Sequence, residues 1–310
     1  MKAAAFFEFG GPEVLRVAEL PTPEAGEGQV RVRVRAAGVQ PFDLAIREGW
    51  TPEGVGGELP RVPGNEFAGV VDQVGEGVDG SEGGVDGISV GAEVLGFNLL
   101  NCYAEYVVVP AENVTPKPAN MPWEVAGGFT AGTQTAHIAL RQLGVGEGDT
   151  VLVHAAAGGV GTAAVQLARL WGAATVIGTA REENHDYLRA LGATPVTYGE
   201  GLAERVRALA PGGVDLVVDG AGGEALEVSL ELVKGERVLT LVEHGRAAEL
   251  GVQVTRGVRQ ASRLAELAAL YAKGDLVFPV RGTYPLERAA DAHREVAGRH
   301  GQGKVVLVME

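Results

Sequence analysis

A run of closely spaced glycines is the part of this sequence with the clearest chemical use. Residues 151–173, VLVHAAAGGVGTAAVQLARLWGA, pass from an apolar segment through Gly158, Gly159 and Gly161 into an alanine- and leucine-rich segment of helical pattern. Glycines let a backbone approach a phosphate group, and the free N–H groups at a helix N-terminus attract its negative charge. This stretch therefore has the composition of a phosphate-binding turn.

The spacing of the glycines favours a dinucleotide as the ligand. In the pattern G-x-G-x-x-G, Ala156 takes the first position, and Gly158 and Gly161 take the other two. Close packing between a helix and a strand would explain Gly161, but it does not explain the pair Gly158-Gly159. We therefore expect Gly158, Gly159, Val160 and Gly161 to bind a pyrophosphate at the first strand-to-helix turn of a βαβ series.

The end of the next apolar segment bears on which dinucleotide binds. An Asp or Glu that binds the ribose of NADH is expected about twenty residues after the glycines. Here Thr179 and Ala180 are followed by Arg181, which suits the 2′-phosphate of NADPH. We therefore expect NADPH as the cofactor, with these three residues at its adenosine end. In the alternative, Arg181 is solvated and pairs with a nearby acid: Glu182, Glu183 or Asp186.

Tyr198 ends the short segment PVTY and is a further candidate for the same end of the cofactor. Its ring would stack near the adenine, or its hydroxyl would donate to the phosphate. A half-buried tyrosine at a strand end is the alternative, and the sequence leaves the two open.

Composition limits the class of protein. The chain has 310 residues, of which 46% are hydrophobic and 21% charged, and a net charge of −14. Such a negative charge argues against nucleic acid and anionic membranes as partners. No apolar run is long enough to span a membrane, and the N-terminus does not read as a secretory signal. The single cysteine, Cys102, allows no intrachain disulfide, so we expect a cytoplasmic protein.

The order of segment types predicts the elements that position these residues. Residues 1–119 are rich in Val, Gly and Pro; in QVRVRVRAAGV (29–39) valines alternate with arginines, as in a half-buried strand. Several such short strands indicate a small β-rich unit. The Gly- and Asp-rich stretch 75–91 lacks the ligand spacing of a calcium loop and is expected to be a flexible turn.

Residues 120–255 alternate between apolar runs and segments of helical pattern. Strands without polar alternation, spaced by helices, indicate a parallel sheet covered on both faces. Residues 256–310 begin with a helix, SRLAELAALYAKG, that ends at Gly274, and continue with the strand-like pieces LVFPV (276–280) and KVVLVM (304–309). The apolar runs of the middle stretch are TVLVHA, TVIGTA, LVVDGA and RVLTLV, and its helical segments are TAAVQLARLWG, HDYLRALG and EALEVSLELVKG.

Six motifs together resemble the medium-chain dehydrogenase/reductases, and most closely their zinc-free quinone oxidoreductase branch. The resemblance implies an α/β protein: a GroES-like catalytic domain from residues 1–119 and 256–310, and a Rossmann domain from residues 120–255. It also implies an active site between the domains and a homodimer or homotetramer. The motifs are AAAGGVG (155–161), AAGVQPFDLAIREG (36–49), PRVPGNEFAGVV (60–71), CYAEYVVVP (102–110), QTAHIAL (134–140) and GQGKVVLVM (301–309).

The positions where zinc-dependent relatives carry metal ligands hold other residues here. The early Cys position is Gln40, and the His of the His-Glu pair is Asn65, followed by Glu66. Catalytic zinc needs three protein ligands, usually His or Cys, and the six histidines show no ligand spacing. We therefore expect no metal.

A metal-free member of this family would transfer hydride from NADPH to a quinone or a similar conjugated carbonyl. The protein would orient the acceptor and donate hydrogen bonds to its oxygen. Two alternatives share the cofactor residues: a reductase of enones or enoyl thioesters, and a low-turnover NADPH-binding sensor protein.

The family pattern also assigns residues to the site. Gln40 replaces the expected Asn of an N-P-x-D motif and can still donate to a carbonyl. Asp43 belongs to the same motif and more readily fixes the loop than reacts. Asn65 is expected to face the cleft, and Thr135 falls near the nicotinamide. Trp50 stands where related reductases place a tyrosine, and we expect it either to form an aromatic wall or to serve as packing.

Overall fold

A six-stranded parallel sheet forms one half of the computed structural model, which describes residues 1–52, 54–78, 87–298 and 301–310. Its strand order is β10-β9-β8-β11-β12-β13, so the chain starts at the centre, moves to one edge and then crosses to the other side. This is the Rossmann order, and its direction reverses between β8 and β11. The strands are β8 Thr150–Val153, β9 Thr175–Thr179, β10 Thr194–Val196, β11 Leu216–Asp219, β12 Val238–Thr240 and β13 Gln253–Val254.

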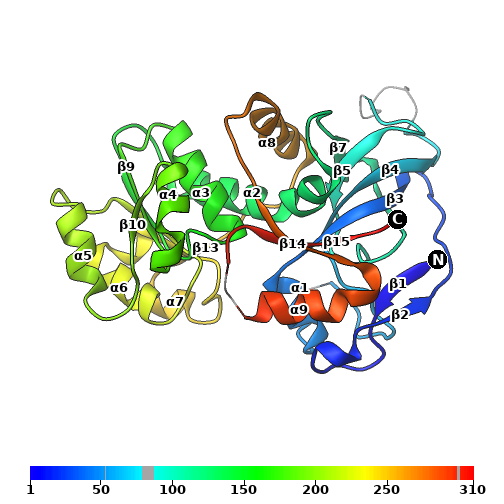
Figure 1. The fold of residues 1–310 in the computed structure, drawn as a ribbon, viewed down its shortest axis with the longest axis horizontal. Coiled ribbons are helices and arrows are strands. Elements are labelled where there is room, and N and C mark those ends of the chain that lie inside the picture. The colour runs from blue at the N-terminus through cyan, green and yellow to red at the C-terminus, as the bar shows by residue number, and fades with distance from the viewer. Residues whose placement is uncertain (53, 79–86, 299–300) are drawn as a thin grey trace.

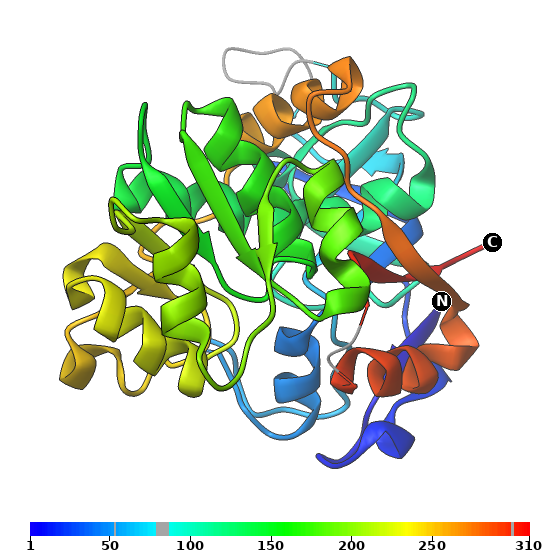
Figure 2. The same ribbon diagram turned by 60° about the vertical axis from the view of Figure 1, so that its left-hand side comes forward.

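Helices cover both faces of this sheet, as Figure 2 shows. Val151 and Val153 of β8 belong to one hydrophobic core and Leu152 to another, because successive side chains of a strand point to opposite faces. The prediction of a doubly covered parallel sheet is confirmed. The first core contains residues of α2 Trp123–Leu143, α3 Gly159–Leu170, α4 His185–Ala190 and α8 Ala261–Lys273; the second contains residues of α5 Leu202–Leu209, α6 Glu224–Leu232 and α7 Ala247–Leu250.

A seven-stranded, mostly antiparallel sheet forms the other half, and both ends of the chain lie there (Figure 1). β3 pairs with β4, β6 and β15, so the last strand lies beside the long early one. The strands are β3 Gln29–Val39, β4 Glu66–Val74, β5 Glu93–Phe97, β6 Tyr106–Pro110, β7 Val114–Pro116, β14 Val280–Pro285 and β15 Lys304–Val308, with a separate hairpin of β1 Lys2–Ala5 and β2 Arg16–Glu19. The helices here are α1 Pro41–Arg47 and α9 Ala289–Ala297, with single 3₁₀ turns at Pro12–Val14, Ala111–Asn113 and Leu286–Arg288. The six-stranded half has single 3₁₀ turns at Glu182–Asn184 and Gly235–Arg237.

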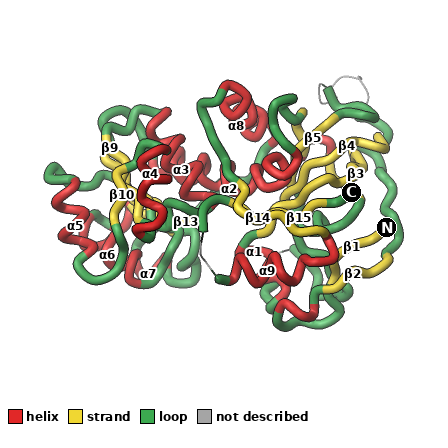
Figure 3. The backbone as a smooth tube through the Cα atoms, viewed as in Figure 1, coloured by secondary structure: helices red, strands yellow, loops and turns green. Residues whose placement is uncertain are grey.

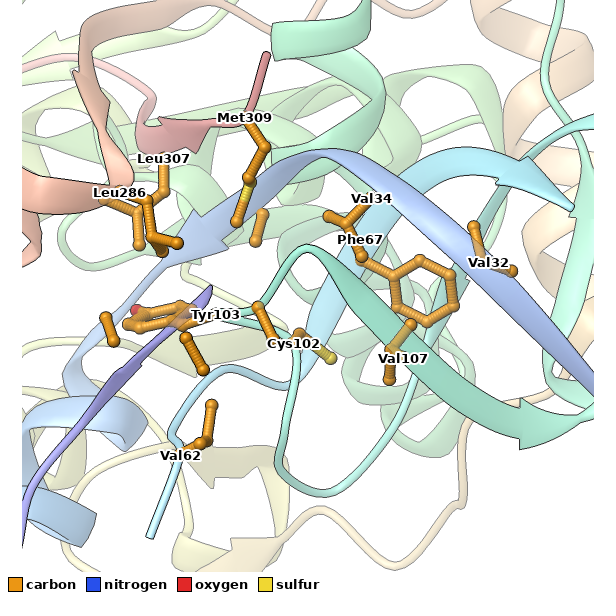
Figure 4. Packing of buried hydrophobic residues seen from close by; sticks show 14 of the residues in the cluster. Val32, Val34, Val62, Phe67, Cys102, Tyr103, Val107, Leu286, Leu307 and Met309 are labelled. Carbon is orange, nitrogen blue, oxygen red and sulfur yellow. The ribbon is translucent and has the colours of Figure 1, made fainter. Parts of the chain in front are cut away.

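The core of this half combines early and late parts of the chain. Val32 and Val34 of β3 point into it, and Leu307 and Met309 come from the C-terminal segment (Figure 4). Tyr103 lies among them and is fully buried. The alternation predicted for residues 29–39 is confirmed, and it is the C-terminal strand that completes the core.

Helix α2 lies between the two sheets, as the tube in Figure 3 shows. A Cβ on Gly127 would lie 2.5 Å from the Cβ of Ala36, and one on Gly132 would lie 3.0 Å from the carbonyl oxygen of Gly159. These glycines therefore let α2 contact β3 and the glycine turn directly. The domain bounds at 119/120 and 255/256 stay a prediction.

One predicted strand is wrong. In LVFPV only Val280 enters β14, although Leu276 and Phe278 are buried. The side chain of Gln166 takes the place of a neighbouring strand: its Oε1 accepts from the N–H of Val277, and its Nε2 donates to the Val277 carbonyl, both at 2.9 Å. The predicted end of α8 is confirmed, because Gly274 caps it with φ +82°. The predicted flexible turn at 75–91 lies partly outside the described residues, which omit 79–86.

Candidate active site

The glycine turn joins β8 to α3 at the point where the strand order reverses. Gly161 lies against the turn, because a Cβ there would be 2.4 Å from the carbonyl oxygen of Ala155. Gly158 caps α3, and its nearest neighbour to such a Cβ is 3.4 Å away. Ala155 has φ +54°, an uncommon conformation for a residue with a side chain. Gly161 is thus required for packing, whereas Gly158 has room for a Cβ, so packing does not explain the glycine there.

The side chain of Thr179 forms hydrogen bonds with this turn. Its hydroxyl accepts from the N–H of Ala155 at 3.2 Å and lies 3.1 Å from Nδ1 of His154. The other ring nitrogen of His154 lies 3.0 Å from the hydroxyl of Ser229. Burial lowers the pKa of His154 to about 4, so the ring is neutral at pH 7. Thr179 and the neighbouring Ala180 are buried. The side chain of Thr179 therefore faces the protein interior, where its hydroxyl holds the backbone of the turn.

Arg181 and Tyr198 lie together just beyond the ends of β9 and β10. Nε of Arg181 donates to the Tyr198 hydroxyl at 3.0 Å. Its guanidinium also lies 3.9 Å from Glu183, which is one of the acids expected to compete for it. Tyr198 is 49% exposed, so the pair lies at the surface of the protein.

Two further predicted cofactor residues lie on the helices that meet at the turn. Val160 is half-buried in the first turn of α3. Thr135 is half-buried on α2, about one helical turn after Gly132, which packs against Gly159. The structure thus brings Val160 and the α2 segment of Thr135 to the same region.

Asp43 is fully buried and holds the loop before α1. Its carboxylate accepts from the N–H of Gln40 at 3.0 Å, the N–H of Gly64 at 3.2 Å and the hydroxyl of Tyr103 at 2.9 Å. Burial raises the pKa of Asp43 to about 7, although the hydrogen bond from Tyr103 opposes that shift. These contacts account for Asp43 as a structural residue, and they also occupy the hydroxyl of Tyr103.

Gln40 and Asn65 are brought together at the edge of this loop. Nε2 of Gln40 donates to Oδ1 of Asn65. On the other side, Nζ of Lys304 donates to Oε1 of Gln40 at 3.2 Å. Lys304 also forms an ion pair with Glu66, 2.7 Å between Nζ and Oε1, and both side chains are almost completely buried. Two predicted residues are therefore joined to a buried cation that the sequence did not single out.

The backbone around Asn65 is also fixed. Arg259 donates to the Asn65 carbonyl at 2.8 Å, and the other oxygen of Glu66 accepts from the N–H of Ala131 at 2.6 Å. Burial lowers the pKa of Arg259. Glu66 and Lys304 lie within the motifs PGNEF and GQGKVVLVM. The motifs therefore contained both residues, but nothing in them indicated that the two form an ion pair.

Trp50 packs on Phe42 rather than on this group. The residue is 52% exposed, and its ring stands edge-on to Phe42, 5.4 Å between centroids. It therefore has exposed aromatic surface, and it forms no hydrogen bond or ring contact with Gln40 or Asn65.

The donor set does not suit zinc. Gln40 and Asn65 present amides to each other, and the ammonium of Lys304 adjoins them, whereas catalytic zinc needs anionic or imidazole ligands. Across residues 1–52, 54–78, 87–298 and 301–310, no three His, Cys, Asp or Glu side chains form a group that could hold a metal ion.

Two cavities among the described residues have neither amide of the pair in their lining, although Phe278 of the second also lies beside Gly159. One, of about 520 Å³, is lined by residues that include Arg141, Arg256 and Arg263, and the other, of about 610 Å³, by residues that include Tyr187 and Phe278. We therefore assign the site from the convergence of the glycine turn and the amide pair. The C-terminal segment links them, because the N–H of Gly303 donates to the carbonyl of Ala157 at 2.9 Å.

Comparison with known proteins identifies the family. Residues 26–119 match the alcohol dehydrogenase GroES-like domain, and residues 191–307 match the zinc-binding dehydrogenase family. The chain is 32% identical to the chloroplastic NADPH-dependent alkenal/one oxidoreductase of Arabidopsis thaliana, over 99% of this chain and 79% of that protein. The chain belongs to the medium-chain dehydrogenase/reductase superfamily.

Solved structures of other medium-chain dehydrogenase/reductases have the same fold. The Escherichia coli quinone oxidoreductase complexed with NADPH is 27% identical with a TM-score of 0.83, over all of both chains. An NAD-dependent alcohol dehydrogenase is 33% identical with a TM-score of 0.86, also over all of both chains. The predicted Rossmann and GroES-like architecture and the zinc-free, quinone oxidoreductase-like branch are confirmed.

This chain is thus an NAD(P)-binding oxidoreductase of the superfamily that acts on a small molecule. In the described part of the chain, no helix combines the length and the apolar character that crossing a bilayer requires.

Proposed function

We propose that this protein is an NADPH-dependent, zinc-independent reductase of quinones or similar conjugated carbonyls. The observation that supports this most directly is the Gln40–Asn65 amide pair, which adjoins the buried ammonium of Lys304. Amides and a nearby fixed positive charge stabilise an oxygen that becomes negative, as happens when a conjugated carbonyl accepts a hydride at carbon.

The residues at the glycine turn fit a dinucleotide. Gly158 and Gly159, with Val160 and the N-terminus of α3, suit a pyrophosphate, and Thr135 lies on the adjoining helix. Arg181 and Tyr198 offer a guanidinium and a hydroxyl to the 2′-phosphate that distinguishes NADPH. When bound, NADPH supplies the hydride.

The chain's own residues then act on the acceptor. The amide pair orients the acceptor's oxygen, and an N–H group of the pair donates to it as negative charge develops. Trp50 offers an exposed aromatic surface to a flat acceptor. One proton taken up from solvent balances the reaction: acceptor, NADPH and H⁺ give the reduced acceptor and NADP⁺.

The test is the oxidation of NADPH, followed at its absorbance, with a panel of simple quinones, enones and an enoyl thioester. We expect turnover with the quinones that a metal chelator leaves unchanged. Turnover confined to enones or to the thioester would favour the alternative reductase. Tight NADPH binding without turnover of any acceptor would favour a sensor protein and overturn the proposal. The association into a homodimer or homotetramer and the cytoplasmic location belong to the same proposal.

A further inference from the structure

The direction of the hydrogen bonds around Gln40 can be derived from Lys304. An ammonium only donates, so the oxygen of the Gln40 carboxamide must face it. The nitrogen of Gln40 then faces Asn65 and donates to its oxygen. The nitrogen of Asn65 must therefore point away from Gln40. That nitrogen forms no hydrogen bond with any of the described residues.

We propose that Asn65 is the hydrogen-bond donor to the acceptor's oxygen and that Lys304, acting through Gln40, is the residue that positions and polarises it. The proposal rests on the proposed function for the identity of the acceptor, a conjugated carbonyl. Each bond in the series Lys304–Gln40–Asn65 runs in one direction, and each donor strengthens the next in a buried environment. We call this series of hydrogen bonds the relay. Gln40 is its middle member, and the amide N–H groups of Asn65 are its end.

The surroundings fix both ends of the relay. The ion pair with Glu66 holds the ammonium of Lys304, and Arg259 holds the carbonyl of Asn65. The stem of Lys304 also lies against the glycine turn, because a Cβ on Gly159 would be 2.9 Å from its Cδ. The relay therefore starts at the wall of the proposed cofactor site and ends at the proposed acceptor site.

The test uses 4-nitrophenolate, a flat oxyanion whose binding is read from its absorbance without turnover. We expect Asn65→Ala to weaken its binding at least tenfold and to lower kcat with a quinone by about 100-fold, the usual loss of one oxyanion donor. Lys304→Met should weaken phenolate binding severalfold, and the double variant should bind no more weakly than Asn65→Ala alone. The dissociation constant for NADPH should change less than threefold in Asn65→Ala.

Two further variants test whether a loss of phenolate binding comes from a disturbed fold. Glu66→Gln/Lys304→Met removes the buried charges together and should bind phenolate as Lys304→Met does. Lys117→Met is the matched control, because Lys117 is also buried and ion-paired, 3.0 Å from Glu93, and we expect wild-type binding there.

Independent, additive effects of Lys304→Met and Asn65→Ala would overturn the relay, as would unchanged phenolate binding in Asn65→Ala. Failure of the proposed function is distinguishable: the wild-type protein would then reduce no acceptor, while the phenolate series would still follow the expected order.

Discussion

At the scale of single residues, Arg181 bears on the choice between the two nicotinamide dinucleotides. It follows β9, at the position where an acid would bind the ribose of NADH. The structure places its guanidinium on the hydroxyl of Tyr198, 3.0 Å away, with Glu183 at 3.9 Å. A doubly charged phosphate beside Arg181 and Tyr198 would form charge-assisted hydrogen bonds with the guanidinium, which are stronger than hydrogen bonds between neutral groups.

Arg181→Ala should therefore weaken NADPH binding about tenfold or more, the usual effect of losing a charge-assisted hydrogen bond, and leave NADH binding nearly unchanged. Titration of the cofactor's fluorescence measures both. Tyr198→Phe should show a smaller loss in the same direction. Arg189→Ala, which removes an exposed arginine paired with Asp186, serves as the control. Equal losses for both cofactors in Arg181→Ala would refute this role.

At the scale of elements, the β8–α3 turn separates two uses of glycine. Gly161 is required because the helix lies directly on Ala155 and Ala156. Gly158 has φ −73°, which any residue adopts, and a Cβ there would make only an ordinary contact, 3.4 Å from the carbonyl oxygen of Ala155. Packing therefore explains the one glycine but not the other, which we attribute to access to the helix N-terminus.

A pair of alanine variants distinguishes these uses. Gly161→Ala should lower the free energy of unfolding by about 1–3 kcal/mol, because the new Cβ overpacks the backbone of the turn. Gly158→Ala should leave stability unchanged within about 0.5 kcal/mol but weaken NADPH binding. Urea unfolding and cofactor titration measure the two effects. Loss of stability in Gly158→Ala, or none in Gly161→Ala, would contradict this assignment.

At the scale of the whole molecule, folding buries ionisable groups that titrate differently in the unfolded chain. Burial lowers the pKa of His154 to about 4 and that of His293 to about 3, and Arg47 beside His293 acts in the same direction. Below pH 6.5 the unfolded chain protonates both rings and the folded chain does not, so stability falls as pH falls towards 4. Asp43, with its pKa raised to about 7, opposes this: between pH 7 and 3.8 the folded chain keeps a proton that the unfolded chain releases.

His293→Gln should therefore make stability less dependent on pH. Between pH 6 and 4.5, the slope of the free energy of unfolding should decrease by up to about 1.4 kcal/mol per pH unit, which corresponds to one proton. Urea unfolding at several pH values measures it. An unchanged slope would mean that His293 is protonated in the folded state.

Much of the fold was predictable because local sequence patterns report local structure. The alternation in residues 29–39 predicted β3, and Gly274 marked the end of α8. The strand predicted at 276–280 was wrong because Gln166, more than 100 residues earlier, takes up the backbone groups of Val277. Hydropathy cannot show that a side chain replaces a neighbouring strand.

By itself, the sequence determined the family, the glycine turn, the arginine that follows β9 and the two amides in place of zinc ligands. Only the tertiary structure decided how those amides are oriented, because their orientation depends on Lys304, 264 residues from Gln40. The C-terminal strand pairs with β3 and brings that ammonium into the site. Motifs and periodicity describe neighbours along the chain, whereas the direction of a buried hydrogen bond depends on which distant donor packing places beside it.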